Sequence, residues 1–142
     1  MCSVPVIGEM TEGEGPAVVR LWETCGLTRP WNDPTADLDQ ARRGATSTVL
    51  VARDYGVVVG SVMAGMDGHR GWIYYLAVTP EVQGTGVGAE LTQAAERWLA
   101  SAGARKVQLM VRDGNPAAGF YERLGYERQH VTVLGRWLPA GE

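Results

Sequence analysis

Three glycines alternate with other residues in the segment Gln83-Gly-Thr-Gly-Val-Gly88, directly before a long amphipathic stretch. The first amides of a helix have no partner within the helix, and together with the helix dipole they attract an anion. Glycine lets such a backbone come close to the anion because it carries no side chain. The spacing therefore predicts a phosphate-binding turn at the start of a helix.

Other uses of a glycine-rich turn fit this segment less well. A P-loop needs Lys followed by Ser or Thr after the last glycine, whereas Ala89 and Glu90 follow here. A dinucleotide fingerprint has the spacing G-x-G-x-x-G in the first βαβ unit, but the spacing here is G-x-G-x-G and three predicted strands come earlier. A flexible turn without a ligand stays open as an alternative, although three alternating glycines are conformationally costly.

The elements on either side of the turn must hold it in place. An apolar strand over residues 72–78 ends at Thr79-Pro80, because proline cannot donate to a strand ladder. After the turn, one apolar stripe recurs with helical spacing. Its members are Val87, Leu91, Ala94, Ala95, Trp98, Leu99 and Ala102. Beyond Gly103 the pattern predicts a strand over 106–112, a helix over 116–124 and a last strand over 126–134, with an extension to Leu138 left open.

The first half of the chain supplies the rest of the fold. The pattern predicts a strand over 3–7, a helix ending near Cys25, a second helix ending near Arg43, and a hairpin with strands over 46–53 and 57–66. The first helix has one apolar face, formed by Val18, Leu21, Trp22 and Cys25. Asp33 before Pro34 is a helix start, with a capping side chain and then proline at the first helical position. The order β-α-α-β-β-β-α-β-α-β predicts an α/β (α+β mixed) fold, a mixed sheet with helices on both faces. We expect a single domain over residues 1–142.

Composition narrows the class of protein. The 142 residues are 45% hydrophobic and 20% charged, with a formal net charge of −3. Without a basic stripe, binding to nucleic acid is not expected. Without a run of about 18 apolar residues, neither is a membrane span. The cysteines, Cys2 and Cys25, are expected as free thiols in a reducing compartment, which favours a cytoplasmic location.

Two motifs in register resemble the GNAT superfamily of N-acetyltransferases. The segment from Tyr75 to Leu91 resembles its acetyl-CoA motif Q/R-x-x-G-x-G/A, matched at Gln83, Gly86 and Gly88. The segment Gly119-Phe-Tyr-Glu-Arg-Leu-Gly-Tyr126 resembles the second motif of the family. Two further segments, over 29–34 and 67–71, look like the small bacterial YpeA-like branch. The resemblance implies the GNAT fold with a mostly antiparallel sheet, and acetyl-CoA as co-substrate without a metal.

The resemblance also implies which residues contact the cofactor. Backbone groups of the strand would meet the pantetheine arm, the amides of the turn would hold the pyrophosphate, and the Val78 amide would polarise the acetyl carbonyl. The expected contacts are Leu76, Ala77, Val78, Gln83, Gly84, Thr85, Gly86, Val87, Gly88, Ala89, Asn115 and Tyr121. Tyr121 matches the tyrosine that protonates the departing thiolate, although core packing is its alternative.

Two positions depart from the family pattern. Some relatives carry a glutamate base twelve residues before the tyrosine, where this chain has Leu109. Asp67, His69 and Tyr74, acting through water, are the alternatives, and His69 has the ordinary pKa closest to neutral. Relatives commonly carry an asparagine at the position of Gly114. Asn115 either takes over its contact with CoA or caps the following helix.

The acceptor is expected to be a primary amine, either a small molecule or a peptide amine. A polar, acidic and aromatic set supplies the candidate acceptor residues, each with a purely structural alternative: Trp31, Asn32, Asp33, Asp67, His69, Arg70 and Tyr74. The leading function is an acetyl-CoA-dependent N-acetyltransferase acting by direct attack in a ternary complex. A non-catalytic acetyl-CoA-binding or regulatory protein and transfer of another acyl group are the alternatives. The segment 131–138 is a candidate contact of a homodimer.

Overall fold

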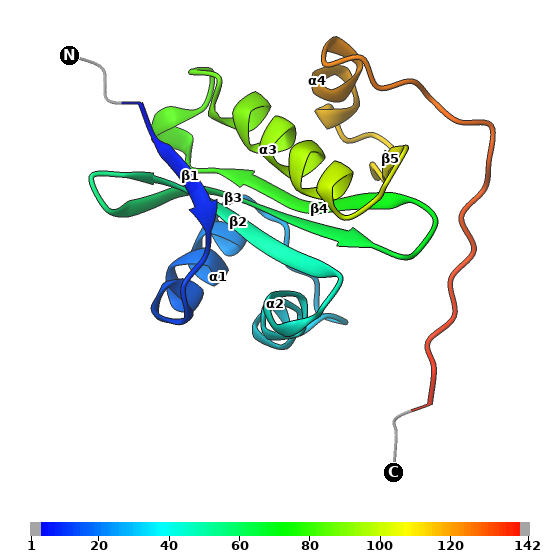
Figure 1. The fold of residues 1–142 in the computed structure, drawn as a ribbon, viewed down its shortest axis with the longest axis horizontal. Coiled ribbons are helices and arrows are strands. Elements are labelled where there is room, and N and C mark those ends of the chain that lie inside the picture. The colour runs from blue at the N-terminus through cyan, green and yellow to red at the C-terminus, as the bar shows by residue number, and fades with distance from the viewer. Residues whose placement is uncertain (1–3, 140–142) are drawn as a thin grey trace. The chain divides into compact units, whose positions relative to one another are not determined.

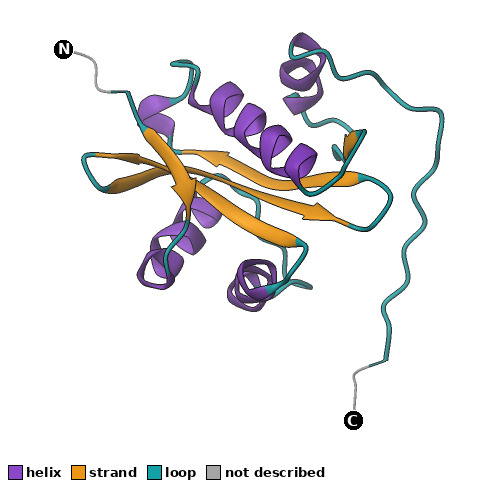
Figure 2. Cartoon of the chain, viewed as in Figure 1, coloured by secondary structure: helices purple, strands orange, loops and turns teal. Residues whose placement is uncertain are grey.

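The computed structural model describes residues 4–139, and the chain divides into two compact units, Met1–Met110 and Val111–Glu142. The first unit holds the sheet and three of the α-helices (Figures 1 and 2). Its elements, in chain order, are β1 (Val6–Glu9), the 3-10 turn η1 (Glu12–Glu14), α1 (Gly15–Thr24), α2 (Pro34–Arg43), β2 (Ser47–Asp54), β3 (Val57–Met66), β4 (Gly71–Val78), η2 (Pro80–Val82), α3 (Val87–Ser101) and β5 (Val107–Leu109).

The five strands lie in the order β1-β2-β3-β4-β5. Neighbouring strands are antiparallel except for β4 and β5, which are parallel because α3 forms the crossover between them. In Figure 2, α3 covers one face of the sheet, and α1 and α2 cover the other. The predicted mixed sheet with helices on both faces is therefore confirmed.

Each face of the sheet has its own apolar core. The α3 side contains Leu91, Ala95 and Leu99 of the predicted helical stripe, together with Val62 and Ile73 from the strands. On the other side, the predicted apolar face of α1 packs on the sheet with Leu38 of α2: Val18, Leu21 and Trp22 are buried, and Cys25 is partly buried. The indole Nε1 of Trp22 is fully buried and donates to Ser61 Oγ at 3.0 Å. That bond satisfies both polar groups within the core.

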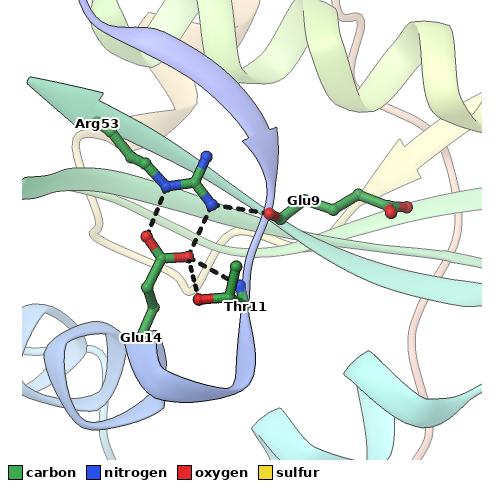
Figure 3. Close-up of polar contacts among 4 residues, drawn as sticks. All are labelled: Glu9, Thr11, Glu14 and Arg53. Carbon is green, nitrogen blue, oxygen red and sulfur yellow. Dashed lines mark hydrogen bonds and ion pairs between the residues drawn. The ribbon is translucent and has the colours of Figure 1, made fainter. Parts of the chain in front are cut away.

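The junction of β1, α1 and β2 is held by Arg53 (Figure 3). Its guanidinium donates to both carboxylate oxygens of Glu14, at 2.5 and 2.7 Å, and to the Glu9 carbonyl at 2.8 Å. The same Glu14 carboxylate accepts from the amide and the hydroxyl of Thr11, which closes a capping box before the helix. Arg53 thus fixes the edge strand and the first helix against the second strand.

Several predicted boundaries agree with the structure. Both α2 and β3 cover their predicted ranges, and Asp33 caps α2 by accepting the amides of Thr35 and Ala36 at 3.1 Å. The predicted strand 3–7 instead begins at Val6, after Pro5, and residue 3 lies outside the described residues. The strand predicted over 106–112 is shorter, Val107–Leu109, and pairs with Gly71–Ile73.

The second unit contains α4 (Ala117–Arg123), close to the predicted helix over 116–124. The strand predicted over 126–134 is wrong, because residues 126–139 contain no strand. Branched apolar residues favour an extended backbone, but a strand also needs a partner for its ladder, and the sequence pattern does not supply one. Val131 and Val133 are 72% and 62% exposed, as expected for a segment without that partner.

Candidate active site

The glycine turn forms as predicted at the start of α3. Gly84 and Gly86 take left-handed backbone angles, with φ of 83° and 96°, which residues with a side chain rarely adopt. The first helical bond runs from the Glu90 amide to the Gly86 carbonyl at 3.0 Å. The amides of Val87, Gly88 and Ala89 precede that bond, so they have no acceptor within the helix.

The turn itself offers an anion backbone amides and no cationic side chain of its own segment. The sequence contains no lysine or arginine between Thr79 and Glu96. The Thr85 hydroxyl donates to the Val82 carbonyl, which closes the turn. Gln83, predicted to flank the pyrophosphate, donates through Nε2 to the Val78 carbonyl at 2.8 Å. Its amide therefore ties the turn to the end of β4.

Val78 ends β4 with its polar groups turned away from β3. It lies opposite Gly60 of β3, and the next residue, Thr79, donates its N–H to the Val59 carbonyl at 2.9 Å. In an antiparallel pair the residues that exchange these bonds alternate along the strand. The N–H and C=O of Val78 therefore point toward the β5 side of β4. On that side, β5 pairs with β4 only over Gly71–Ile73, at the opposite end of the strand from Val78.

A bulge in β4 lies just before Val78. The register with β3 shifts between Ser61 and Met63, and Tyr75 has a φ of 52°. The sequence alternation predicts Tyr75 on the face of Ile73, opposite Trp72 and Tyr74. That expectation is wrong, because the extra residue of the bulge turns Tyr75 onto the α1 and α2 side.

There Tyr75 contacts both helices of that side. Its ring stacks on Trp22 with a centroid distance of 4.0 Å and an interplanar angle of 7°. Its hydroxyl donates to Asp37 Oδ2 of α2 at 3.0 Å. Burial and the Asp37 carboxylate raise the pKa of Tyr75 to about 12, against a smaller lowering by a hydrogen bond with Asn32 and by the charge of Arg29.

The predicted acceptor residues divide into two groups along β4. Asn32 forms a side-chain hydrogen bond with Tyr75. Trp31, which precedes Asn32 in the chain, is 56% exposed. Tyr74 is 38% exposed and lies with Trp72, the two ring centroids being 6.5 Å apart. Burial, with a smaller contribution from the Asp67 charge, raises the pKa of Tyr74. Asp33 is occupied as the cap of α2.

Asp67, His69 and Arg70 belong to the other end of β4. One Asp67 carboxylate oxygen accepts the amides of His69 and Arg70 at 2.8 and 2.7 Å, and the other accepts Trp72 Nε1 at 3.1 Å. The two backbone amides and the indole lower the pKa of Asp67. Because β4 is eight residues long, this hairpin lies roughly 20 Å from Val78. The structure does not bring His69 near the Val78 amide, the predicted donor to the acetyl carbonyl.

The second unit carries Tyr121 and Asn115. The Tyr121 ring makes edge contacts with Phe120 and Tyr126, at centroid distances of 5.0 and 5.7 Å. Burial raises the pKa of Tyr121 to about 12. Asn115 Oδ1 accepts the amide of Ala117, the first residue of α4, at 2.9 Å, although the N-cap position itself is Pro116. This bond occupies the amide oxygen of Asn115 and not its NH₂ group.

A sequence comparison matches residues 16–126 to the Acetyltransferase (GNAT) family. The chain belongs to the GNAT acetyltransferase family. Solved structures with the same fold include the aminoglycoside N-acetyltransferase AAC(6')-Iy in complex with CoA. It shares 19% identity over 96% of this chain and 97% of its own, with a TM-score of 0.82.

Two further solved structures share the GNAT fold. An aminoglycoside acetyltransferase from an uncultured soil metagenomic sample, in complex with sisomicin, is 19% identical over 97% of each chain, with a TM-score of 0.73. A protein described as a transcriptional regulator from Bacillus halodurans C-125 is 21% identical over 94% of this chain and 99% of its own, with a TM-score of 0.76.

Sequence reasoning missed three residues of this GNAT chain that lie around the end of β4. Asp37 and Tyr75 meet because of the bulge, for which the sequence carries no local signal. Cys25, predicted only as a free thiol and as part of an apolar helix face, donates to the Val78 carbonyl at 3.3 Å. Leu109, at the position of the absent glutamate, packs against the core on the α3 side.

Within residues 4–139, no group of three or more His, Cys, Asp or Glu side chains could hold a metal ion. Over the same residues, no helix combines the length and the apolar character that crossing a membrane requires.

Proposed function

We propose that this chain transfers an acetyl group from acetyl-CoA to a primary amine by direct attack in a ternary complex. The observation that carries the proposal is the Val78 N–H, which points away from β3 next to a glycine turn with three helix-start amides. A donor so placed can stabilise the oxyanion of a tetrahedral intermediate. The turn amides would hold the pyrophosphate. CoA in the AAC(6')-Iy complex supports the choice of cofactor.

The reaction needs two proton movements. The amine nitrogen attacks the thioester carbon, the C–S bond breaks, and the CoA thiolate leaves. We assign the proton for this thiolate to Tyr121, on its match to the second family motif. The amine attacks in its neutral form and loses its proton to water. His69 lies far from Val78, and the raised pKa of Tyr74 keeps that phenol protonated near neutral pH, so it is not available to accept the proton.

For the acceptor, we propose a small amine bound on the α1 and α2 side of β4. The residues that support this position are Trp31, Asn32, Asp37, Tyr74 and Tyr75. Aminoglycosides in complex with similar structures support a small-molecule amine. Asp33, Asp67, His69 and Arg70 are not included, because they cap a helix or lie in the distant hairpin.

Three further expectations stay predictions. The single domain over residues 1–142 is supported by the family match, which spans both compact units. A homodimer through residues 131–138 is supported by the exposure of Trp137, which is 73%. The cytoplasmic location rests on the reduced state expected for the two cysteines.

The test is the initial rate of CoA thiol release from acetyl-CoA with a panel of amines. Wild type should show release that depends on the amine. Tyr121→Phe should lower kcat by about 100-fold while acetyl-CoA affinity stays within about twofold, because only the proton donor is lost. Tyr126→Phe, which removes a hydroxyl from the neighbouring ring, is the matched control and should keep its activity. Equal turnover in wild type and Tyr121→Phe would remove Tyr121 from the mechanism.

A second candidate function is binding of acetyl-CoA without catalysis. Leu109 in place of a glutamate base favours it, since this side chain packs in the core and offers no proton acceptor. In that case calorimetry would detect acetyl-CoA binding while no amine in the panel releases CoA.

A further inference from the structure

The Val78 carbonyl accepts hydrogen bonds from two side chains that come from different parts of the first unit. Gln83 Nε2 approaches from the glycine turn at 2.8 Å, and Cys25 Sγ approaches from the end of α1 at 3.3 Å. The N–H of the same peptide group, that of Thr79, donates to the Val59 carbonyl of β3 at 2.9 Å. The peptide group between Val78 and Thr79 is therefore fixed at both of its polar ends.

Fixing this peptide also aims the Val78 N–H. The preceding residue, Ala77, is held in register with Ser61 of β3. With the peptide groups on both sides of Val78 restrained, its two backbone dihedrals have little freedom. A donor stabilises an oxyanion only if it already points at the position where the charge develops. Loss of one restraint on the carbonyl would let the Val78 N–H turn away from that position.

We propose that Cys25 is a positioning residue for acetyl transfer, and that its thiol holds the Val78 carbonyl so that the Val78 N–H is aimed at the acetyl oxygen. The inference rests on the proposed function of Val78. The thiol itself is not assigned any contact with the substrates. Burial raises the pKa of Cys25, which keeps the sulfur in its S–H form, the form that can donate.

Three variants separate this role from simple packing. Cys25→Ala removes the donor and should lower kcat about three- to tenfold, the loss of one neutral hydrogen bond, with the KM for acetyl-CoA within about twofold. Cys25→Ser keeps a donor and should stay within about twofold of the wild-type kcat. Val19→Ala, which trims a partly buried α1 residue of the same core, should lower stability but not kcat. Full activity in Cys25→Ala, or equal losses in the Ala and Ser variants, would overturn the proposal.

A second readout does not depend on the enzyme's activity. The carbonyl carbon resonance of Val78 in the ligand-free protein should shift in Cys25→Ala and return toward its wild-type position in Cys25→Ser. If wild type releases no CoA with any amine, the proposed function fails, and the resonance still reports whether the thiol holds the carbonyl. An unmoved Val78 resonance in Cys25→Ala would overturn the positioning role even in an active enzyme.

Discussion

Tyr121 keeps its phenolic proton over the pH range in which acetyl transfer can be measured. Its pKa is raised by burial to about 12, so the protonated form needed by a general acid is populated at pH 7 and still at pH 10. We expect kcat to rise with pH to a plateau as the amine acceptor loses its proton. Because Tyr121 stays protonated, kcat should then show no decline up to about pH 10. A phenol with the ordinary pKa near ~10 would be about half ionised there.

The measurement is a pH profile of kcat, corrected for the hydrolysis of acetyl-CoA without enzyme. Tyr121→Phe serves as the control, because it has no phenol to titrate. A basic limb with an apparent pKa of about 10 or lower in wild type, absent from the variant, would contradict the shift. It would mean that Tyr121 ionises as an ordinary surface tyrosine.

At the residue scale, the sequence predicted the backbone part of the candidate site better than the side chains around it. Gly84, Gly86 and Val78 were named from a local motif, and in the structure they lie at the start of α3 and at the end of β4. Tyr75 could not be placed, because alternation along a strand assumes a regular strand, and one extra residue reverses the face. Asp37 and Cys25 reach the site through tertiary packing, which a local pattern does not encode.

At the scale of the elements, the turn before α3 depends on a left-handed glycine. Gly86 has a φ of 96°, and a Cβ placed there would meet no atom within 4 Å, so Gly86→Ala costs conformational energy rather than space. That cost is about 1–2 kcal/mol. If the turn relaxes to avoid it, the amides no longer converge on the position proposed for the pyrophosphate. We expect the Kd for acetyl-CoA to rise about 5- to 30-fold by calorimetry.

The opposite end of the same helix supplies a matched control. Gly103 follows α3 with a φ of 100° and is equally open around a Cβ. Gly103→Ala should therefore lower the free energy of unfolding to a similar extent and leave the affinity for acetyl-CoA unchanged. Similar loss of affinity in both variants would show that the helix as a whole, and not the turn, determines binding.

Element boundaries were predictable where a local chemical signal ends the element. Asp33 and Pro34 start α2, and the turn at Tyr55-Gly56, directly after Asp54, separates β2 from β3. The ends of β5 and the predicted strand over 126–134 lack such a signal. Their extent depends on the presence of a neighbouring strand, which is set by the fold and not by the segment itself.

At the scale of the whole molecule, the Arg53–Glu14 pair couples stability to pH. Arg53 lowers the pKa of Glu14 to about 2 from its ordinary value of 4.5, mainly through their hydrogen bonds. Because the folded-state pKa is the lower one, the stabilisation is complete above pH 4.5 and is lost as the pH falls toward 2. The side chain of Glu14 is 17% exposed and that of Arg53 is 24% exposed. Solvent screening therefore reduces the contribution of the pair to the free energy of unfolding to about 1–2 kcal/mol.

Urea unfolding of wild type and Glu14→Gln at pH 7, 5 and 3 measures this coupling. The variant can still accept the Thr11 amide but has no charge to pair with Arg53, so it should be less stable by about 1–2 kcal/mol at pH 7. The difference should shrink at pH 3, because Glu14 is then protonated in the unfolded chain but still mostly ionised in the folded protein, so folding must release a proton. Glu12→Gln removes one negative charge from the same turn, outside the Arg53 contact, and controls for net charge. A stability difference that stays constant from pH 7 to pH 3 would mean that Glu14 acts through its cap alone and that the ion pair adds nothing to the stability of the sheet edge.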